Sequence, residues 1–213
     1  MRRQKMDVKD HLRSLGDAGS APPSPRFSGS RTPAPLQGIE TSVVSIAADD
    51  KGGKGFIIDG EGKIATNFHL VDAASRIKVT MLSGDVFLGK VVRTDPNRDL
   101  ALIQIATKTT SYLQLGDSSS VDVGEEVYVP GRQAGAGASN ELTRGIINAL
   151  RRINGMAMIQ MDIPIDSGQS GAPVLSSQGV VVGISTSRTG QPAADNTGFA
   201  LSVTELKAFV FGQ

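Results

Sequence analysis

The chain has 213 residues, with 39% hydrophobic and 20% charged side chains and a formal net charge of +1, a balance typical of globular proteins. Nucleic acid is not an expected partner, because proteins that bind it usually carry a strongly basic face. Cysteine is absent and His11 and His69 are the only histidines, which excludes disulfides and thiol nucleophiles and argues against zinc sites. No apolar run reaches the roughly 20 residues that span a bilayer. We therefore expect no transmembrane segment, no metal and no cofactor.

Residues 1–36 have the composition of a tail or linker. Their second half is a Pro/Ser/Gly tract, which cannot bury a core. Before this tract, Val8, Leu12 and Leu15 have helical spacing. That spacing suits a short amphipathic helix on a membrane or partner, but a solvated tail is the simpler interpretation.

The first five residues, Met1–Lys5, are basic, but no apolar segment follows them. No signal peptide is therefore predicted. By default this indicates a cytoplasmic protein, and an extracytoplasmic location would require a missing upstream segment.

A folded domain is predicted for residues 37–213, where short β-rich segments alternate with turns containing Gly, Pro and Asp. Two sets of six strands with closely spaced turns predict an all-β fold of antiparallel barrels or a sandwich. A short terminal helix is predicted over 203–210, because Ser202 and Glu205 have the spacing of a capping box. The twelve predicted strands cover residues 42–47, 55–58, 63–66, 77–81, 86–93, 101–105, 126–129, 142–150, 157–161, 172–175, 180–186 and 198–201.

Three side chains from separate segments can form a nucleophilic centre. Ser170 stands in a glycine-rich turn, His69 follows a predicted strand, and Asp99 lies at a turn before another strand. Alone, each has a structural explanation: a tight turn, a structural histidine, or an aspartate that caps its own turn. A serine hydroxyl needs a base and that base needs an orienting group, and with His11 in the tail, His69 is the only available base. Together they predict a Ser-His-Asp triad at strand ends, where functional side chains commonly lie.

The motifs around these residues resemble one protease family. In the first half they are Gly55-Phe56-Ile57-Ile58, Thr66-Asn67-Phe68-His69-Leu70-Val71 and Asp95-Pro96-x-x-Asp99-Leu100-Ala101-Leu102. In the second half they are Leu115-Gly116-Asp117-Ser118, Thr143-Arg144-Gly145-Ile146-Ile147, Gln160-Met161-Asp162, Ser167-Gly168-Gln169-Ser170-Gly171, Gly183-Ile184-Ser185-Thr186 and Gly198-Phe199-Ala200-Leu201. In this order and spacing, residues 40–206 resemble the trypsin-like domain of HtrA (Deg) serine proteases.

The resemblance implies two perpendicular antiparallel β-barrels, the first at about 40–106 and the second at about 122–204, with the active site in the cleft between them. It also implies polypeptide substrates and a homotrimer. The chain ends at Gln213, so we expect no carboxy-terminal PDZ domain of the kind that typical HtrA proteins carry.

Carried onto this sequence, the family mechanism assigns a role to each residue. Ser170 attacks the scissile carbonyl, His69 takes and returns the proton, and Asp99 orients the imidazole. The backbone N–H groups of Gly168 and Ser170 form the oxyanion hole, worth about 3 kcal/mol per donor.

The resemblance also predicts which residues select the substrate. None of them is charged, which predicts a preference for small or medium aliphatic side chains; the alternative is that they belong to the core. The pocket residues are Ile163, Pro164, Ile165, Ser185, Thr186 and Ser187. Two nearby loops, 131–139 and 188–196, either regulate the site by ordering or are plain connections.

Two departures from the family bear on whether the site is active. Gln169 stands where the family usually has Asn, and Ala172 where it usually has Gly. A rival hypothesis is therefore a catalytically silent, protease-like module that captures unfolded polypeptides.

Overall fold

The computed structural model describes residues 33–117, 121–131, 141–188 and 197–212. Most of the predicted tail and of the two predicted loops lies outside these ranges. The 3-10 turn η1 (Ala34–Leu36), at the end of the predicted tail, buries Leu36. A second 3-10 turn, η2 (Ile39–Ser42), leads into the first strand.

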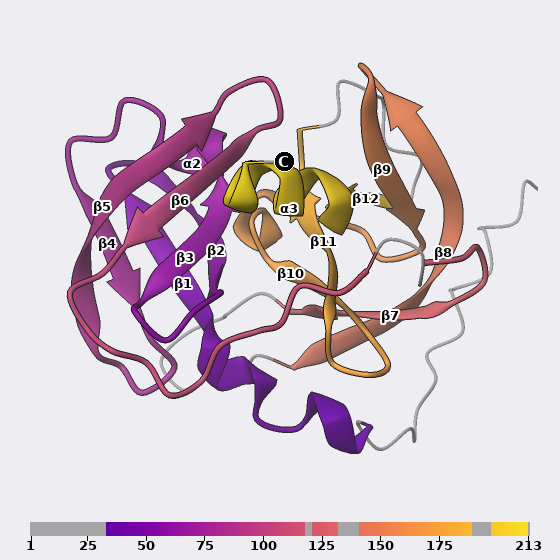
Figure 1. Ribbon diagram of the computed structural model, residues 1–213, viewed down its shortest axis with the longest axis horizontal. Helices are drawn as coiled ribbons and strands as arrows, with labels where there is room; N and C mark the ends of the chain where they lie inside the picture. The colour runs from indigo at the N-terminus through magenta and orange to yellow at the C-terminus, as the bar shows by residue number, and fades with distance from the viewer. Residues whose placement is uncertain (1–32, 118–120, 132–140, 189–196, 213) are drawn as a thin grey trace, which may run out of the picture. The chain divides into compact units, whose positions relative to one another are not determined.

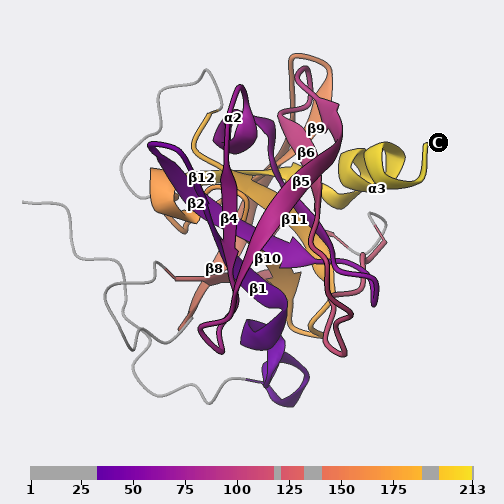
Figure 2. The same ribbon diagram turned by 90° about the vertical axis from the view of Figure 1, so that its left-hand side faces the viewer.

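The first six strands close into a barrel (Figure 1). They are β1 (Val43–Ala48), β2 (Lys51–Ile57), β3 (Lys63–Asn67), β4 (Ile77–Thr80), β5 (Val86–Asp95) and β6 (Leu100–Gln104). Neighbours pair antiparallel in the order β1-β2-β3-β6-β5-β4. The short helix α2 (Phe68–Val71) follows β3. Figure 2 shows α2 at one end of this barrel and the indigo 3-10 turns at the other.

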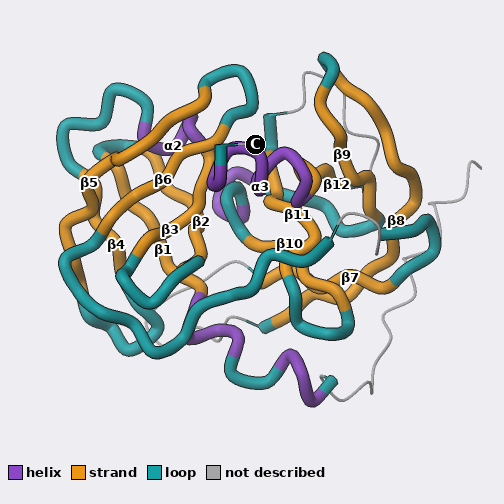
Figure 3. Tube along the Cα trace, in the orientation of Figure 1, coloured by secondary structure: helices purple, strands orange, loops and turns teal. Residues whose placement is uncertain are grey.

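The second six strands form another closed barrel. They are β7 (Glu126–Pro130), β8 (Leu142–Ile153), β9 (Met156–Met161), β10 (Pro173–Ser176), β11 (Val181–Thr186) and β12 (Gly198–Ser202). They close in the order β10-β11-β12-β9-β8-β7, again with antiparallel neighbours. All twelve strands lie within a few residues of their predicted positions, and the predicted all-β double barrel is confirmed (Figure 3).

The core has three parts, which explains why some strands are buried on both faces. One cluster fills the first barrel, around Ile57 and Ile64, and another fills the second, around Ile147. A third cluster joins residues of both barrels, including Phe56 and Leu175. Because successive strand residues point to opposite faces, Phe56 packs toward the second barrel while Ile57 packs inside the first. This shared cluster holds the two barrels against each other.

The terminal helix α3 (Val203–Phe211) contacts β6 of the first barrel and β9, β11 and β12 of the second. The Ser202 hydroxyl caps it by accepting from the Thr204 N–H at 3.3 Å. The predicted capping box was wrong in its other half, because Glu205 turns away from the cap and bonds outside the helix. Gly212 ends the helix with φ 73°, a left-handed conformation that glycine adopts without strain. No helix among the described residues is long and apolar enough to cross a membrane.

Candidate active site

His69 is the second residue of α2, immediately beyond the end of β3. Its ring lies against the turn between β5 and β6. The Nδ1 atom is 2.7 Å from Asp99 Oδ2, and the backbone N–H of His69 donates to Asp99 Oδ1 at 2.9 Å. A carboxylate on Nδ1 leaves Nε2 as the proton acceptor. The structure thus brings the predicted base and the predicted carboxylate together.

The backbone around Asp99 is also fixed. Its carbonyl accepts from the Phe68 N–H at 3.0 Å and from Asn67 Nδ2 at 3.1 Å. Asp99 has φ 56°, a left-handed conformation that is uncommon outside glycine but enriched in Asp and Asn. Thr186, from β11 of the second barrel, donates to Asp99 Oδ2 at 3.4 Å. Both barrels therefore contact this carboxylate.

Ser170 lies between the 3-10 turn η4 (Ser167–Gln169) and β10. The turn is pressed against β2 of the first barrel, since the Lys54 N–H donates to the Ser170 carbonyl at 2.8 Å. Gly171 has φ 84°, and a Cβ there would lie 2.1 Å from the Lys54 carbonyl oxygen. Only glycine fits this conformation and this close approach. The predicted nucleophile thus stands where the two barrels meet.

The Ser170 hydroxyl is held by Ser187 rather than by His69. It accepts from the Ser187 N–H at 3.0 Å and lies 2.8 Å from the Ser187 hydroxyl. Of the hydrogen bonds between described residues, none joins it to the His69 ring. The Ser170 residue is 0% exposed. In this conformation the His69–Asp99 pair is formed, and among the described residues the nucleophile is bonded to Ser187.

A predicted oxyanion donor is also engaged. The Gly168 N–H donates to Asp166 Oδ1 at 2.8 Å, and the Gln169 N–H donates to the same oxygen at 3.1 Å. In turn, the Gln169 Oε1 atom accepts a hydrogen bond from the Asp166 N–H at 3.3 Å. This is a capping box. The sequence analysis missed Asp166, although Asp-x-x-Gln is the spacing that signals such a cap.

The six predicted pocket residues occupy different environments. Ile163 is 1% exposed and packs in the core of the second barrel. Ser185 is 0% exposed, and its hydroxyl lies within hydrogen-bond distance of the carbonyls of Gln169 and Ala172. Pro164 and Ser187 are exposed, Ile165 is half-buried, and Thr186 bonds Asp99 as described above. Their role in substrate selection stays a prediction.

Lys54 is an unexpected residue beside the Ser170 turn. It is 2% exposed, and burial lowers the pKa of its ammonium group to about 8. A buried ammonium is disfavoured because it loses its hydration. The first barrel therefore contains a group near the site that titrates at mildly alkaline pH.

The comparison with known families agrees with this geometry. The trypsin-like peptidase domain matches residues 53–184, a stretch that includes His69, Asp99 and Ser170. The chain belongs to this family.

Individual relatives narrow the family to the HtrA type. The chain is 32% identical over 185 residues to the serine protease Do-like HtrA of Bacillus subtilis, covering 81% of this chain and 41% of that protein. It is 33% identical over 169 residues to the chloroplastic protease Do-like 1 of Arabidopsis thaliana, covering 74% and 38%. A crystal structure of the serine endoprotease from Yersinia pestis superposes with a TM-score of 0.75 at 25% identity, covering 86% of this chain and 66% of that one. The chain spans about two fifths of the length of the first curated relatives it matches.

Proposed function

We propose that this chain is a serine endopeptidase that hydrolyses peptide bonds with His69, Asp99 and Ser170. The observation that carries the proposal is the 2.7 Å contact between His69 Nδ1 and Asp99 Oδ2, formed by residues 30 positions apart in the sequence. Membership of the trypsin-like peptidase family supports it. Polypeptides are the proposed substrates.

The chemistry follows from these groups. Ser170 Oγ attacks the carbonyl carbon of the substrate while His69 Nε2 takes the hydroxyl proton, and Asp99 stabilises the resulting imidazolium. The C–N bond then breaks as His69 returns the proton to the leaving amine. A water molecule, deprotonated by His69, attacks the acyl ester and releases Ser170. Activity is expected to fall in acid, since imidazolium cannot accept the serine proton.

Attack requires two rearrangements. The Ser170 hydroxyl must donate its proton to His69 instead of to Ser187, and the Gly168 N–H must turn from Asp166 toward the oxyanion. Each oxyanion donor contributes about 3 kcal/mol to transition-state stabilisation. The conformation described here is therefore a resting state, which we expect substrate binding to convert.

The decisive test is reaction with a fluorophosphonate probe, followed by mass spectrometry. A single adduct on Ser170, absent from Ser170→Ala and reduced in His69→Ala, is the expected result. An adduct elsewhere would overturn the assignment of Ser170. Peptide-library cleavage then tests the uncharged pocket, which equal cleavage after Lys or Arg would contradict. Light scattering tests the homotrimer that the family resemblance implies.

The engaged hydroxyl of Ser170 and N–H of Gly168 favour one rival. If the resting state does not convert, the chain is a protease-like module that binds unfolded polypeptides without turnover. Its signature would be no probe adduct together with saturable binding of a denatured, fluorescently labelled protein. Binding with a normal rate of adduct formation would exclude it.

A further inference from the structure

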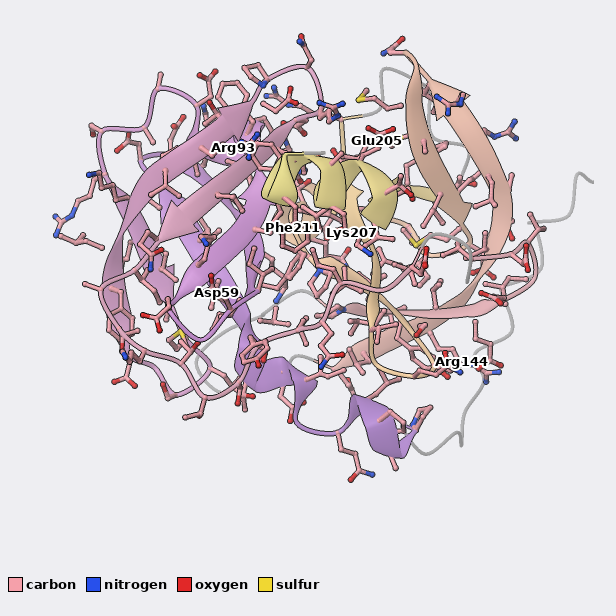
Figure 4. All side chains as sticks on the ribbon, viewed as in Figure 1. Asp59, Arg93, Arg144, Glu205, Lys207 and Phe211 are labelled. Atoms are coloured by element: carbon pink, nitrogen blue, oxygen red, sulfur yellow. The ribbon has the colours of Figure 1, made fainter. Side chains whose placement is uncertain are left out.

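Glu205 joins the helix α3 to both barrels. Its Oε1 atom accepts from the Ala157 N–H of β9 at 3.0 Å, and its Oε2 atom accepts from Arg98 Nε at 3.0 Å. The Glu205 side chain is only 15% exposed. Figure 4 shows Glu205 on the part of α3 that faces β9. A carboxylate with both oxygens used in this way is a fixed link between the second barrel and Arg98.

Arg98 immediately precedes Asp99 in the turn between β5 and β6. Its Nη1 atom donates to Asp95 Oδ2 at 2.7 Å, while the backbone N–H of Arg98 donates to Asp95 Oδ1 at 3.1 Å. Burial acts to raise the pKa of the Asp95 carboxyl, but the hydrogen bonds and charge of Arg98 outweigh it, and the pKa lies below its usual value. The Arg98 guanidinium thus binds two carboxylates, that of Asp95 at the end of β5 and that of Glu205 in α3.

These contacts form a continuous path across the domain. It runs from β9 through Glu205 and Arg98 to the turn that carries Asp99, and through Asp99 to His69. Ser170 belongs to the second barrel, whereas His69 and Asp99 belong to the first. The relative placement of the barrels therefore decides whether His69 can reach the serine hydroxyl.

We propose that Arg98 and Glu205 are positioning residues, which fix the His69–Asp99 pair of the first barrel relative to Ser170 of the second. The role rests on the proposed endopeptidase function. Neither residue is among the predicted catalytic or pocket residues. The pair acts through the Asp99 turn, whose left-handed backbone at φ 56° is held only by its surroundings.

Arg98 could serve only to attach α3 to the first barrel. This role can be tested separately from positioning of the Asp99 turn, because a second contact also attaches α3 to that barrel. Arg93 of β5 lies over the Phe209 ring of α3, 5.1 Å from its centroid. Arg93 and Arg98 therefore both join β5 or its following turn to the same helix. Only Arg98 is adjacent to Asp99. Arg93 is accordingly a matched control.

Loss of the Arg98 link is expected to lower kcat by about 10- to 100-fold, because displacement of a catalytic group by about 1 Å has effects of that size. KM is expected to change little, since Arg98 lies outside the predicted pocket. Arg98→Lys retains the charge but lacks the planar fork that bonds two carboxylates, so it restores part of the loss. Glu205→Gln keeps an acceptor for the Ala157 N–H and removes the charge, and is also expected to be intermediate.

The experiment compares Arg98→Met, Arg98→Lys, Glu205→Gln and Arg93→Met in the full chain. We expect Arg98→Met to lower kcat and the rate of fluorophosphonate labelling, and to shift the acid limb of kcat/KM to lower pH because the imidazolium loses its well-placed carboxylate. Arg93→Met is expected to lower the melting temperature by a similar amount without moving either readout. Equal losses of kcat in Arg98→Met and Arg93→Met, with unshifted pH profiles, would overturn the positioning role.

The proposal can also be tested if the chain proves inactive. A proton on Nδ1 shared with a carboxylate gives a downfield imidazole resonance in the proton NMR spectrum. We expect Arg98→Met to move or broaden this His69 signal and Arg93→Met to leave it in place. An unlabelled wild-type protein with that pattern would contradict the proposed endopeptidase while supporting the link, and an unmoved signal in both variants would contradict the link itself.

Discussion

The two halves of the candidate site differ in how they are held. In the first barrel, backbone groups at the ends of β3 and β6 fix Asp99 against His69, and the two side chains are already in contact. In the second barrel, Ser170 follows a single 3-10 turn, whose geometry depends on the Asp166 carboxylate. The base is already paired with its carboxylate, whereas the turn before the nucleophile is capped by Asp166 and the nucleophile's hydroxyl is bonded to Ser187. Control of activity is therefore expected to act on the second half.

Removal of the nucleophile gives the largest expected effect. Ser170→Ala should lower turnover of a peptide substrate by at least about 10⁴-fold, because the remaining groups supply no covalent route. The free energy of unfolding in urea should change by only about 1 kcal/mol, the usual value of a hydrogen bond. Residual activity near that of the wild type would show that Ser170 is not the nucleophile.

The first-barrel half of the site is tested by Asp99→Asn. Asparagine has the same shape as aspartate and also accepts the left-handed backbone conformation. Turnover should fall by about 10⁴-fold, because the amide stabilises the wrong histidine tautomer. The measurement is kcat at neutral pH, with circular dichroism as the control for folding. A loss smaller than about tenfold would mean that the contact between Asp99 and His69 is structural.

Lys54 joins the halves through its backbone, and its side chain predicts a pH effect on stability. The pKa is about 8 in the folded protein, against 10.5 for an unperturbed lysine side chain. Between these values the unfolded state binds the proton and the folded state does not, so stability rises with pH. Lys54→Met should be more stable than the wild type at pH 7 by up to about 3 kcal/mol. That difference in urea unfolding should vanish near pH 10.5; a pH-independent difference would contradict it.

The smallest effect concerns the cap of the second half. Asp166→Ala removes the acceptor of the Gly168 N–H and should raise the rate of fluorophosphonate labelling by about fivefold, equivalent to the roughly 1 kcal/mol that such a cap contributes. Asp166→Asn keeps a side-chain oxygen and is the matched control. Slower labelling in Asp166→Ala would indicate that the cap assembles the oxyanion hole rather than occupying it.

The fold was predictable because short strands and turns leave a local signal at every step. The short β-rich segments and the turn residues between them located all twelve strands, and the capping residue Ser202 located α3. Glu205 was misassigned because its sequence spacing fits a cap equally well. Its actual partners, Arg98 and the Ala157 N–H, are distant in sequence and meet only in the folded protein.

The contact between His69 and Asp99 was predictable from the sequence, but the contacts of Ser170 with Ser187 were not. His69 and Asp99 meet because β3 and β6 are neighbours, a pairing that the barrel topology supplies. The hydrogen bonds between Ser187 and the Ser170 hydroxyl depend on side-chain rotamers. The spacing of residues in the sequence does not determine these rotamers. The cap from Asp166 to Gly168 did have a signal in the Asp-x-x-Gln pattern, which the stronger catalytic interpretation of the same turn concealed.

The backbone angle of Asp99 restricts what selection can place there. Its left-handed conformation is open to glycine, asparagine and aspartate and disfavours other residues, glutamate included. The reaction, by contrast, requires a carboxylate. Folding permits glycine, asparagine and aspartate at this position, and turnover permits only a carboxylate. Aspartate is the one residue that meets both requirements. In a screen of all twenty residues at this position, selection for folded protein should return all three residue types, and selection for proteolysis only one.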